Sequence, residues 1–280
     1  MIVVTLKGGL GNQLFQYAAA RALALKHKTT VCIDHSFLEA DPKGQWTARK
    51  YRLDVFPALA DLKRYSFTGK ITGKLSSRPR FAEQGLLYNA SFEGLGSDVH
   101  LEGYFQSERY FSAYAEEIRK DLFFPSLKAE YSNNLAPELA FFDNRVSVHI
   151  RRGDMATLKQ ANDVHGTLPP EYYHTAMDHL LKNVSAGLVF CVFSDDMEWV
   201  RSNIQFPGNV LFVDWNQGNE VEDLHLMSLC THHIIANSSF SWWGAWLSDR
   251  EGKQVIAPKN WFRSPAYNSD DIVPSAWLRL

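Results

Sequence analysis

The sequence predicts an α/β protein built from two domains that face each other across a cleft. Two observations lead to this fold class. The N-terminal residues form a strand, helix, strand pattern, and the second half alternates apolar strand-like runs with helical patterns, which is typical of a parallel sheet covered on both faces. The chain has 280 residues, 45% of them hydrophobic and 13% aromatic, enough for one large domain or two of ordinary size.

The first predicted unit begins with the apolar run IVVTL at 2–6, which is typical of a buried strand. The tight loop KGGLGN follows, and apolar residues then recur at helical spacing from 14 to 25, before a second strand, TVCID, at 30–34. From 35 to about 130, glycines and prolines interrupt the pattern. We therefore expect a less regular α/β region there.

The second half is predicted to alternate strands and helices. The predicted strands are VSVHI, LVFCVF, VLFV, HIIA and QVIA, and a helix is expected after each of the first four. The helix after TLPPEYY carries Tyr173, Ala176, Met177, Leu180 and Leu181 on one face. Because the polar stretch KAEYSNNLAPELAFFDNR precedes the first of these strands, we divide the chain into domains 1–135 and 136–280.

Composition and charge exclude several classes of protein. The formal charge of -2 and the pI of about 6.6 give no global attraction to nucleic acid or to an anionic membrane. Cys32, Cys191 and Cys230 lie far apart without CxxC spacing, which indicates reduced thiols and no structural zinc. The chain starts without the features of a signal peptide, and its apolar runs are shorter than the roughly 18 to 20 residues of a membrane span. We expect a cytoplasmic protein with at most peripheral membrane contact.

Polar residues follow the predicted strands of the second half. Ligands of a doubly wound sheet bind beyond the carboxyl ends of its strands, and those positions hold Arg151, Arg152, Gly153 and Asp154, then Ser194, Asp195 and Asp196, then Asp214, and then Asn237, Ser238 and Ser239. Guanidinium groups bind phosphate in bidentate fashion, and helix N-termini present free N–H groups. This edge of the sheet is therefore predicted to bind a phosphorylated ligand.

Each of these patterns also has a structural interpretation. Adjacent arginines are often solvated or paired with carboxylates such as Asp154. Asp195 and Asp196 either hold a metal or, with the preceding serine, cap the next helix. The run SSFSWWGAWLSD also fits a helix cap followed by core aromatics, and His149 fits a buried core histidine. The loop KGGLGN matches neither the P-loop nor the strict dinucleotide fingerprint.

Four motifs together resemble the α-1,2-fucosyltransferases of glycosyltransferase family eleven. They are KGGLGNQLFQYAAARAL (7–23), HIRRGD (149–154), FSDDMEW (193–199) and NSSFSWWGAWL (237–247), in this order along the chain. The stretches YRLDVF (51–56) and LEGYFQSERYF (101–111) are also similar to the family's pattern. The resemblance covers nearly the whole chain, from residue 2 to Trp261.

The resemblance implies a GT-B fold with two Rossmann-like domains, the N-terminal one on the acceptor side and the C-terminal one binding GDP-β-L-fucose. Members of the family move L-fucose with inversion to the 2-hydroxyl of a terminal galactose, without an obligatory metal or a cofactor. Animal members carry a membrane anchor and stem, whereas this chain begins at the catalytic domain. We therefore expect a bacterial enzyme of O-antigen or capsule synthesis, at the inner face of the membrane, with a galactose-terminated oligosaccharide or a lipid-linked glycan as acceptor.

The resemblance also implies roles for individual residues. Arg152 is the expected catalytic partner of the donor diphosphate, because a guanidinium stabilises the charge that grows on the β-phosphate as the C1–O bond breaks. Asp154 and then His149 are the candidates for the base that takes the acceptor proton. The other residues expected at the donor are Gly11, Asn12, Arg151, Asp195, Asp196, Asp223, Asn237, Ser238, Ser239, Phe240 and Trp242, with Trp243 packing beside it. Those expected at the acceptor are Gly9, Gln13, Phe105 and Gln106.

Two other functions stay open. A different GDP-fucose-dependent enzyme, such as a protein O-fucosyltransferase, shares the arginine-bearing strand end, but such enzymes are usually secretory and disulfide-bonded. A non-enzymatic carbohydrate-binding protein would use the eight tryptophans as stacking platforms, yet it has no need of a diphosphate site. Binding of GDP separates these possibilities.

Overall fold

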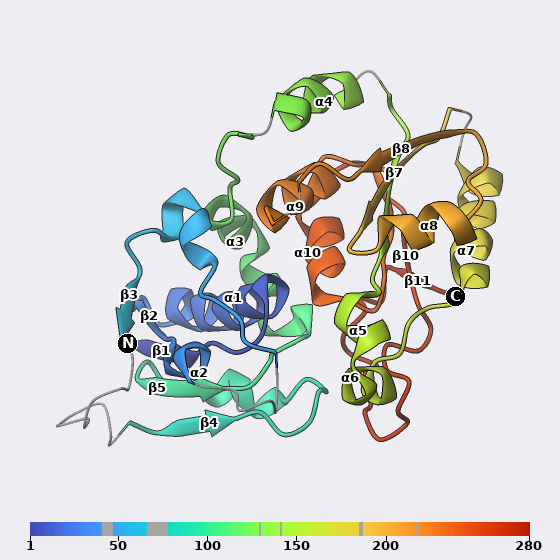
Figure 1. Cartoon of the computed structure of the whole chain (residues 1–280). Coiled ribbons are helices and arrows are strands. Elements are labelled where there is room, and N and C mark those ends of the chain that lie inside the picture. The colour runs from blue at the N-terminus through green and yellow to red at the C-terminus, as the bar shows by residue number, and fades with distance from the viewer. Residues whose placement is uncertain (41–46, 66–77, 129, 141, 185–186, 217) are drawn as a thin grey trace. The chain divides into compact units, whose positions relative to one another are not determined.

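The protein is described by a computed structural model that covers residues 1–40, 47–65, 78–128, 130–140, 142–184, 187–216 and 218–280 (Figure 1). At Tyr65, Tyr131, Glu138, Leu139, Ala140, Asp154, Thr157, Gln160 and Ala161 only the backbone is described. The chain forms two compact units. Unit 1 comprises Met1–Pro125 and Asn268–Pro274, and unit 2 comprises Ser126–Tyr267 and Ser275–Leu280, whereas the sequence analysis placed the division at residue 135.

Unit 1 contains a parallel sheet in the order β3-β2-β1-β5-β4. The strands are β1 (Ile2–Thr5), β2 (Val31–Asp34), β3 (Lys63–Tyr65), β4 (Arg80–Ala82) and β5 (Val99–Glu102), and the helices are α1 (Leu10–Lys26), α2 (Ser36–Glu39) and α3 (Ala115–Asp121). Short 3-10 helices lie at Leu53–Val55, Pro57–Leu59, Ala90–Gly94, Glu108–Tyr110 and Ser112–Tyr114. The predicted strand, helix, strand unit is confirmed, and so is the irregular region after it.

Unit 2 contains a second parallel sheet, in the order β11-β10-β9-β6-β7-β8. Its strands are β6 (Arg145–Ile150), β7 (Val189–Ser194), β8 (Asn209–Val213), β9 (His232–Ile234), β10 (Val255–Ala257) and β11 (Leu278–Arg279). Its helices are α4 (Glu130–Ala140), α5 (Gly153–Thr157), α6 (Lys159–Val164), α7 (Pro170–Asn183), α8 (Met197–Asn203), α9 (Glu220–Ser228) and α10 (Ser239–Leu247). The five predicted strands are confirmed.

Helices cover both faces of the unit 2 sheet because the side chains of each strand alternate between two cores. In β7, Phe190 and Val192 join a core that includes residues of α7 and α8, whereas Cys191 and Phe193 join another that includes residues of α9 (Figure 1). Strands buried on both faces become continuous apolar runs, and this is why they were recognisable in the sequence.

Two details of unit 2 differ from the sequence analysis. The polar stretch before the first strand contains α4, which was not predicted because its sequence is polar and includes Pro137. Leu181 was expected on the core face of α7, but it is 45% exposed, while Leu180 is fully buried. The amphipathic face of α7 is therefore narrower than predicted.

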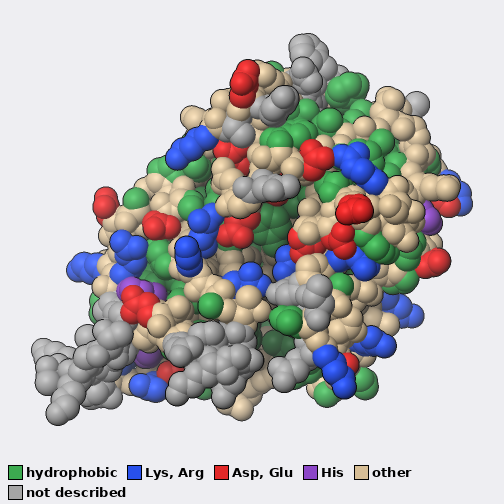
Figure 2. All heavy atoms as spheres, in the orientation of Figure 1, with side chains coloured by type: hydrophobic (Ala, Val, Ile, Leu, Met, Phe, Trp, Pro, Cys, Tyr) green, Lys and Arg blue, Asp and Glu red, His purple; other side chains and the backbone are tan. Residues whose placement is uncertain are grey.

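The described surface agrees with the composition. Figure 2 shows side chains of both charge signs interspersed over one face, in keeping with a formal charge of -2. Among the described residues, no helix is both long and apolar enough to cross a membrane.

Gly244 allows α10 to approach α9 closely. A Cβ atom at this position would lie 2.9 Å from Cβ and 3.1 Å from Sδ of Met227. We predict that Gly244→Leu lowers the free energy of unfolding by about 1 to 3 kcal/mol, because the core cannot take up the added volume. Combined with Met227→Ala, it should cost less than the sum of the two single changes. Strict additivity in denaturant melts would contradict this packing.

Candidate active site

The carboxyl ends of β6 and β7 lie side by side, because Ile150 pairs with Ser194 in the parallel register. The residues that follow these strands, Arg151 and Asp195, are therefore neighbours at one edge of the sheet. Nη1 of Arg151 lies 2.7 Å from Oδ2 of Asp195. The topology alone thus brings together two motifs that are more than 40 residues apart in the sequence.

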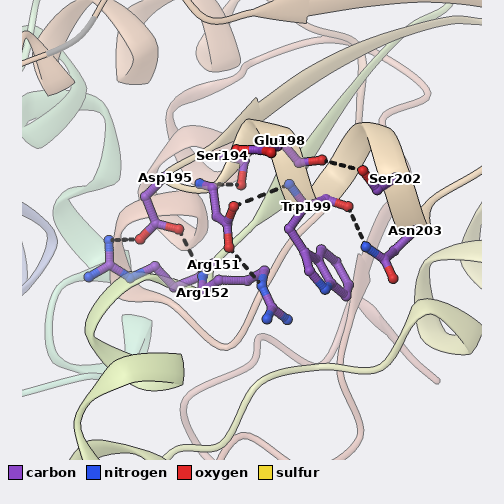
Figure 3. Close-up of polar contacts among 9 residues, drawn as sticks. Arg151, Arg152, Ser194, Asp195, Glu198, Trp199, Ser202 and Asn203 are labelled. Carbon is purple, nitrogen blue, oxygen red and sulfur yellow. Dashed lines mark hydrogen bonds and ion pairs between the residues drawn. The ribbon is translucent and has the colours of Figure 1, made fainter.

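Asp195 holds both arginines (Figure 3). While Oδ2 forms the ion pair with the side chain of Arg151, Oδ1 accepts a hydrogen bond of 2.8 Å from the backbone N–H of Arg152. Gly153 makes this approach possible, since a Cβ atom there would overlap the Asp195 carboxylate. The HIRRGD motif therefore has glycine at this position because any larger residue would clash with the Asp195 carboxylate.

The guanidinium group of Arg152 is held at its Nε atom and against one of its planar faces. Its Nε lies 3.1 Å from Oδ2 of Asp196, and its guanidinium carbon lies 3.8 Å from the centre of a ring of Trp199, a favourable cation–π distance. Within the part of the chain that the structure describes, its Nη1 and Nη2 form no hydrogen bond or ion pair. These two nitrogens are the pair with which a guanidinium binds an oxyanion in bidentate fashion.

Asp196 has a second role as the N-cap of α8. Its Oδ1 accepts a hydrogen bond from the backbone N–H of Trp199, and its own N–H donates to Oγ of Ser194. The capping alternative is thus confirmed, and the described residues contain no cluster of His, Cys, Asp or Glu that could hold a metal ion. Their carboxylates hold the arginines, and the expected contact of Asp195 and Asp196 with the donor stays a prediction.

His149 is a core residue. It is only 6% exposed, and its ring centroid lies 5.7 Å from that of Phe240. Burial, with a further effect of the Arg151 charge, lowers its pKa to about 3. A buried imidazole with a lowered pKa is poorly suited to take a proton from an acceptor hydroxyl. The structure therefore argues against His149 as the base and favours its interpretation as a core residue.

The other candidate base, Asp154, lies in α5, but its side chain is outside the described residues. Its assignment stays a prediction.

The N-terminus of α10 lies at the same sheet edge, because β9 neighbours β6 in parallel orientation. Asn237 is buried, and its Nδ2 donates to the backbone oxygens of His165 and Trp261. Ser238 caps the helix by accepting from the N–H of Phe240. Ser239 and Phe240 are half-buried, so both keep surface that a ligand can contact.

Trp242 and Trp243 are fully buried. The ring centroid of Trp242 lies 5.1 Å from that of Trp243 and 5.3 Å from that of Trp277. A side chain without exposed surface cannot touch a ligand directly, so we correct the expected donor contact of Trp242. The alternative of a helix cap followed by core aromatics describes this helix.

Asp223 is half-buried and ends a chain of hydrogen-bonded polar side chains on unit 2. Its Oδ1 accepts a hydrogen bond of 2.9 Å from Nδ2 of Asn216, whose Oδ1 accepts from Oγ of Ser132. Burial raises the pKa of Asp223 to about 7, and the charges of Glu222 and Glu220 act in the same direction. The carboxyl group therefore sits near its midpoint at neutral pH.

The residues expected from the glycine-rich loop and from LEGYFQSERYF lie in unit 1. Gly9 is the N-cap of α1, Gly11 is buried in its first turn, and Oδ1 of Asn12 accepts a hydrogen bond of 2.8 Å from Nε2 of Gln106. Gln106 and Asn12 are thus brought together by the fold.

Gln13 and Phe105 are structural. Gln13 is fully buried. Its Nε2 donates to the backbone oxygens of Gly8 and Lys50, and its Oε1 accepts from the N–H of Arg52. Phe105 is also fully buried. Neither side chain offers surface to an acceptor, and these two expectations are corrected.

The role of Trp199, at the end of FSDDMEW, was not predicted from the sequence. An aromatic residue three positions after a helix-capping aspartate lies in the first turn of the helix, beside the cap. That spacing was a usable signal.

The chain is similar in sequence to known glycosyltransferases. The family model described as Glycosyl transferase family 11 matches residues 88–280. The Alpha-1,2-colitosyltransferase of Escherichia coli is 32% identical, over 100% of this chain and 99% of the relative. The O-antigen biosynthesis glycosyltransferase WbnK of Escherichia coli is 31% identical, over 98% and 99%. The Galactoside alpha-(1,2)-fucosyltransferase 2 of Bos taurus is 30% identical, over 56% of this chain and 47% of the relative.

Among solved structures, fucosyltransferase NodZ from Bradyrhizobium aligns with a TM-score of 0.50 at 14% identity, covering 87% of this chain and 91% of NodZ. At that identity the likeness concerns the fold alone. Together with the two parallel sheets, it confirms the predicted GT-B-like α/β class.

The raised pKa of Asp223 makes stability depend on pH. Its folded-state pKa of about 7 lies above the ordinary aspartate pKa of 3.8, so between these values the folded state binds more protons, and the free energy of unfolding falls as pH rises. We predict that Asp223→Asn removes this contribution, so that the Tm of the variant, relative to wild type, increases between pH 5 and pH 8. Asp178→Asn, at an exposed position of α7, is the control. Equal Tm differences at both pH values would contradict the raised pKa.

Proposed function

The chain belongs to glycosyltransferase family 11, and from this premise we propose that it is an inverting transferase that moves L-fucose from GDP-β-L-fucose to the 2-hydroxyl of a terminal galactose. The observation that carries the proposal is Arg152. Its guanidinium is held by Asp196 and Trp199, while the two Nη nitrogens point to no described partner. It lies at the strand ends, where ligands of α/β sheets bind.

The chemistry needs a positive group at the leaving diphosphate. As the C1–O bond to the β-phosphate breaks, negative charge grows on the phosphate oxygens, and a donor that is already in place stabilises this charge without reorganising. In the proposed reaction Arg152 supplies that group, Arg151 adds charge beside it, and Ser239 meets the diphosphate at the N-terminus of α10. The transfer would then require neither a metal ion nor a cofactor.

Inversion requires the acceptor hydroxyl to attack from the face opposite the diphosphate. Asp154, directly after the arginines, is the proposed group that takes the hydroxyl proton. Asp223 is proposed to accept hydrogen bonds from the guanine base, which a carboxyl group titrating near neutral pH does in its ionised form.

The relatives favour a second candidate for the transferred sugar. A protein that is 32% identical over the whole chain is named Alpha-1,2-colitosyltransferase, and colitose is L-fucose without its 3-hydroxyl group. The name of WbnK refers to O-antigen biosynthesis, which supports a role in surface glycan synthesis. The donor is therefore either GDP-L-fucose or GDP-L-colitose, and both carry the diphosphate for which Arg152 is placed.

The test of the function is GDP release in the presence of EDTA. GDP-L-fucose and GDP-L-colitose are each supplied with lactose or N-acetyllactosamine, and the linkage of the product is determined by NMR. Acceptor-dependent release and a new α1-2 linkage to galactose support the proposal. Binding of GDP without transfer to any galactoside would contradict the proposed acceptor, and failure to bind GDP would contradict the donor site.

We predict that Arg152→Ala lowers the rate at saturating donor about a hundredfold or more, by analogy with the loss of one charge-stabilising donor elsewhere. Arg152→Lys should also be strongly impaired, because a lysine cannot bind two phosphate oxygens with a planar fork. The matched control is Arg201→Ala. That arginine also pairs with an aspartate, Asp214, and lies over an aromatic ring, but it is 47% exposed. Near-normal turnover of Arg152→Ala would refute its role.

A further inference from the structure

The turn after β5 contains a backbone conformation that a bulky residue rarely adopts. Phe105 has a φ of 52°, in the left-handed region that costs a non-glycine residue about 1 kcal/mol or more. Such a conformation persists only where the surroundings hold it, and it is concentrated at functional sites. Two questions follow: which contacts hold Phe105 in this conformation, and which function the conformation serves.

The structural cause is Glu83, which follows β4, the neighbour of β5 in the sheet. Its Oε2 accepts hydrogen bonds from two successive backbone N–H groups, that of Tyr104 at 2.8 Å and that of Phe105 at 2.9 Å. At Gly103, any Cβ atom would lie 2.5 Å from Cβ of Glu83. The carboxylate thus fits directly against the start of the turn.

The buried ring of Phe105 packs against other aromatic rings of unit 1 and so stabilises the turn. It lies edge-on to Tyr110 at 5.2 Å between centroids, and 6.1 Å from Phe92. Burying this ring while Glu83 holds the backbone leaves the preceding residue outside. Tyr104 is 39% exposed, so the strained turn presents an aromatic side chain to solvent and does not bury it.

Two residues after Tyr104, the same turn carries the side-chain amide of Gln106. Gln106 donates to Asn12 at 2.8 Å, which joins the turn to the start of α1. A turn that carries both an exposed aromatic ring and a side-chain amide matches a neutral sugar, whose C–H face packs on an aromatic ring and whose hydroxyls bond to amides. A diphosphate, in contrast, needs cationic groups such as those at the strand ends of unit 2.

We propose that Tyr104 binds a sugar ring of the acceptor glycan, and that Glu83 is the positioning residue that holds Tyr104 in place. This inference rests on the proposed function. The expected acceptor contact moves from the buried Phe105 to its exposed neighbour Tyr104. Glu83, which was not among the residues predicted from the sequence, gains a role.

The experiment measures kcat and both KM values, with lactose as acceptor and whichever of the two GDP-sugars supports transfer. Tyr104→Ala is expected to raise the KM for lactose about tenfold, the loss of one aromatic contact worth about 1.4 kcal/mol, and to leave the donor KM unchanged. Tyr104→Phe should keep a KM near wild type, because the ring remains. Glu83→Gln, which preserves the shape but weakens the charge-assisted bonds, should raise the lactose KM by a smaller factor.

Phe123→Ala is the matched control, since Phe123 is also an exposed aromatic residue of unit 1, at 72% exposure. It should change neither KM. An unchanged lactose KM in Tyr104→Ala, or a rise confined to the donor KM, overturns the inference while the proposed function stands. If the wild-type protein transfers neither sugar to lactose or to N-acetyllactosamine, both the inference and the proposed function are overturned.

Discussion

The carboxylate of Asp195 joins the ends of two strands, and the arrangement of both arginines depends on it. One oxygen pairs with the Arg151 side chain and the other accepts from the backbone N–H of Arg152. This contact exists because β6 and β7 are parallel neighbours in register, and because Gly153 leaves room for the carboxylate. The direction of the chain after β6, and so the start of α5, follows from the same contact.

The site combines two cationic and two anionic groups at short distances. Each carboxylate offsets one guanidinium, so the folded protein tolerates adjacent arginines that would otherwise repel each other. Asp196 and Trp199 engage only Nε and one face of Arg152, which leaves its outer nitrogens for an oxyanion. A guanidinium held in this way loses little conformational freedom when it binds, and preorganisation of this kind is what stabilises charge in a transition state.

Much of this arrangement was predictable from the sequence. Strands buried on both faces appear as continuous apolar runs, and parallel topology then gathers the residues after each run at one edge. The partners of individual atoms were not predictable. Nothing in the string SDD indicates that its carboxylates reach back to the arginines. Nor does the sequence indicate that Phe105 adopts a left-handed conformation, with its ring buried and that of Tyr104 exposed. Similarly, Trp242 and His149 resembled ligand contacts in sequence but serve as core.

Arg152 is proposed to hold the β-phosphate of a GDP-sugar through its outer guanidinium nitrogens. A crystal structure of the protein with GDP tests it most directly. We expect a β-phosphate oxygen within hydrogen-bond distance of Nη1 or Nη2 of Arg152, with the Asp195 and Asp196 contacts intact. A diphosphate bound elsewhere, or one that displaces Arg152 from Asp196 and Trp199, would contradict it.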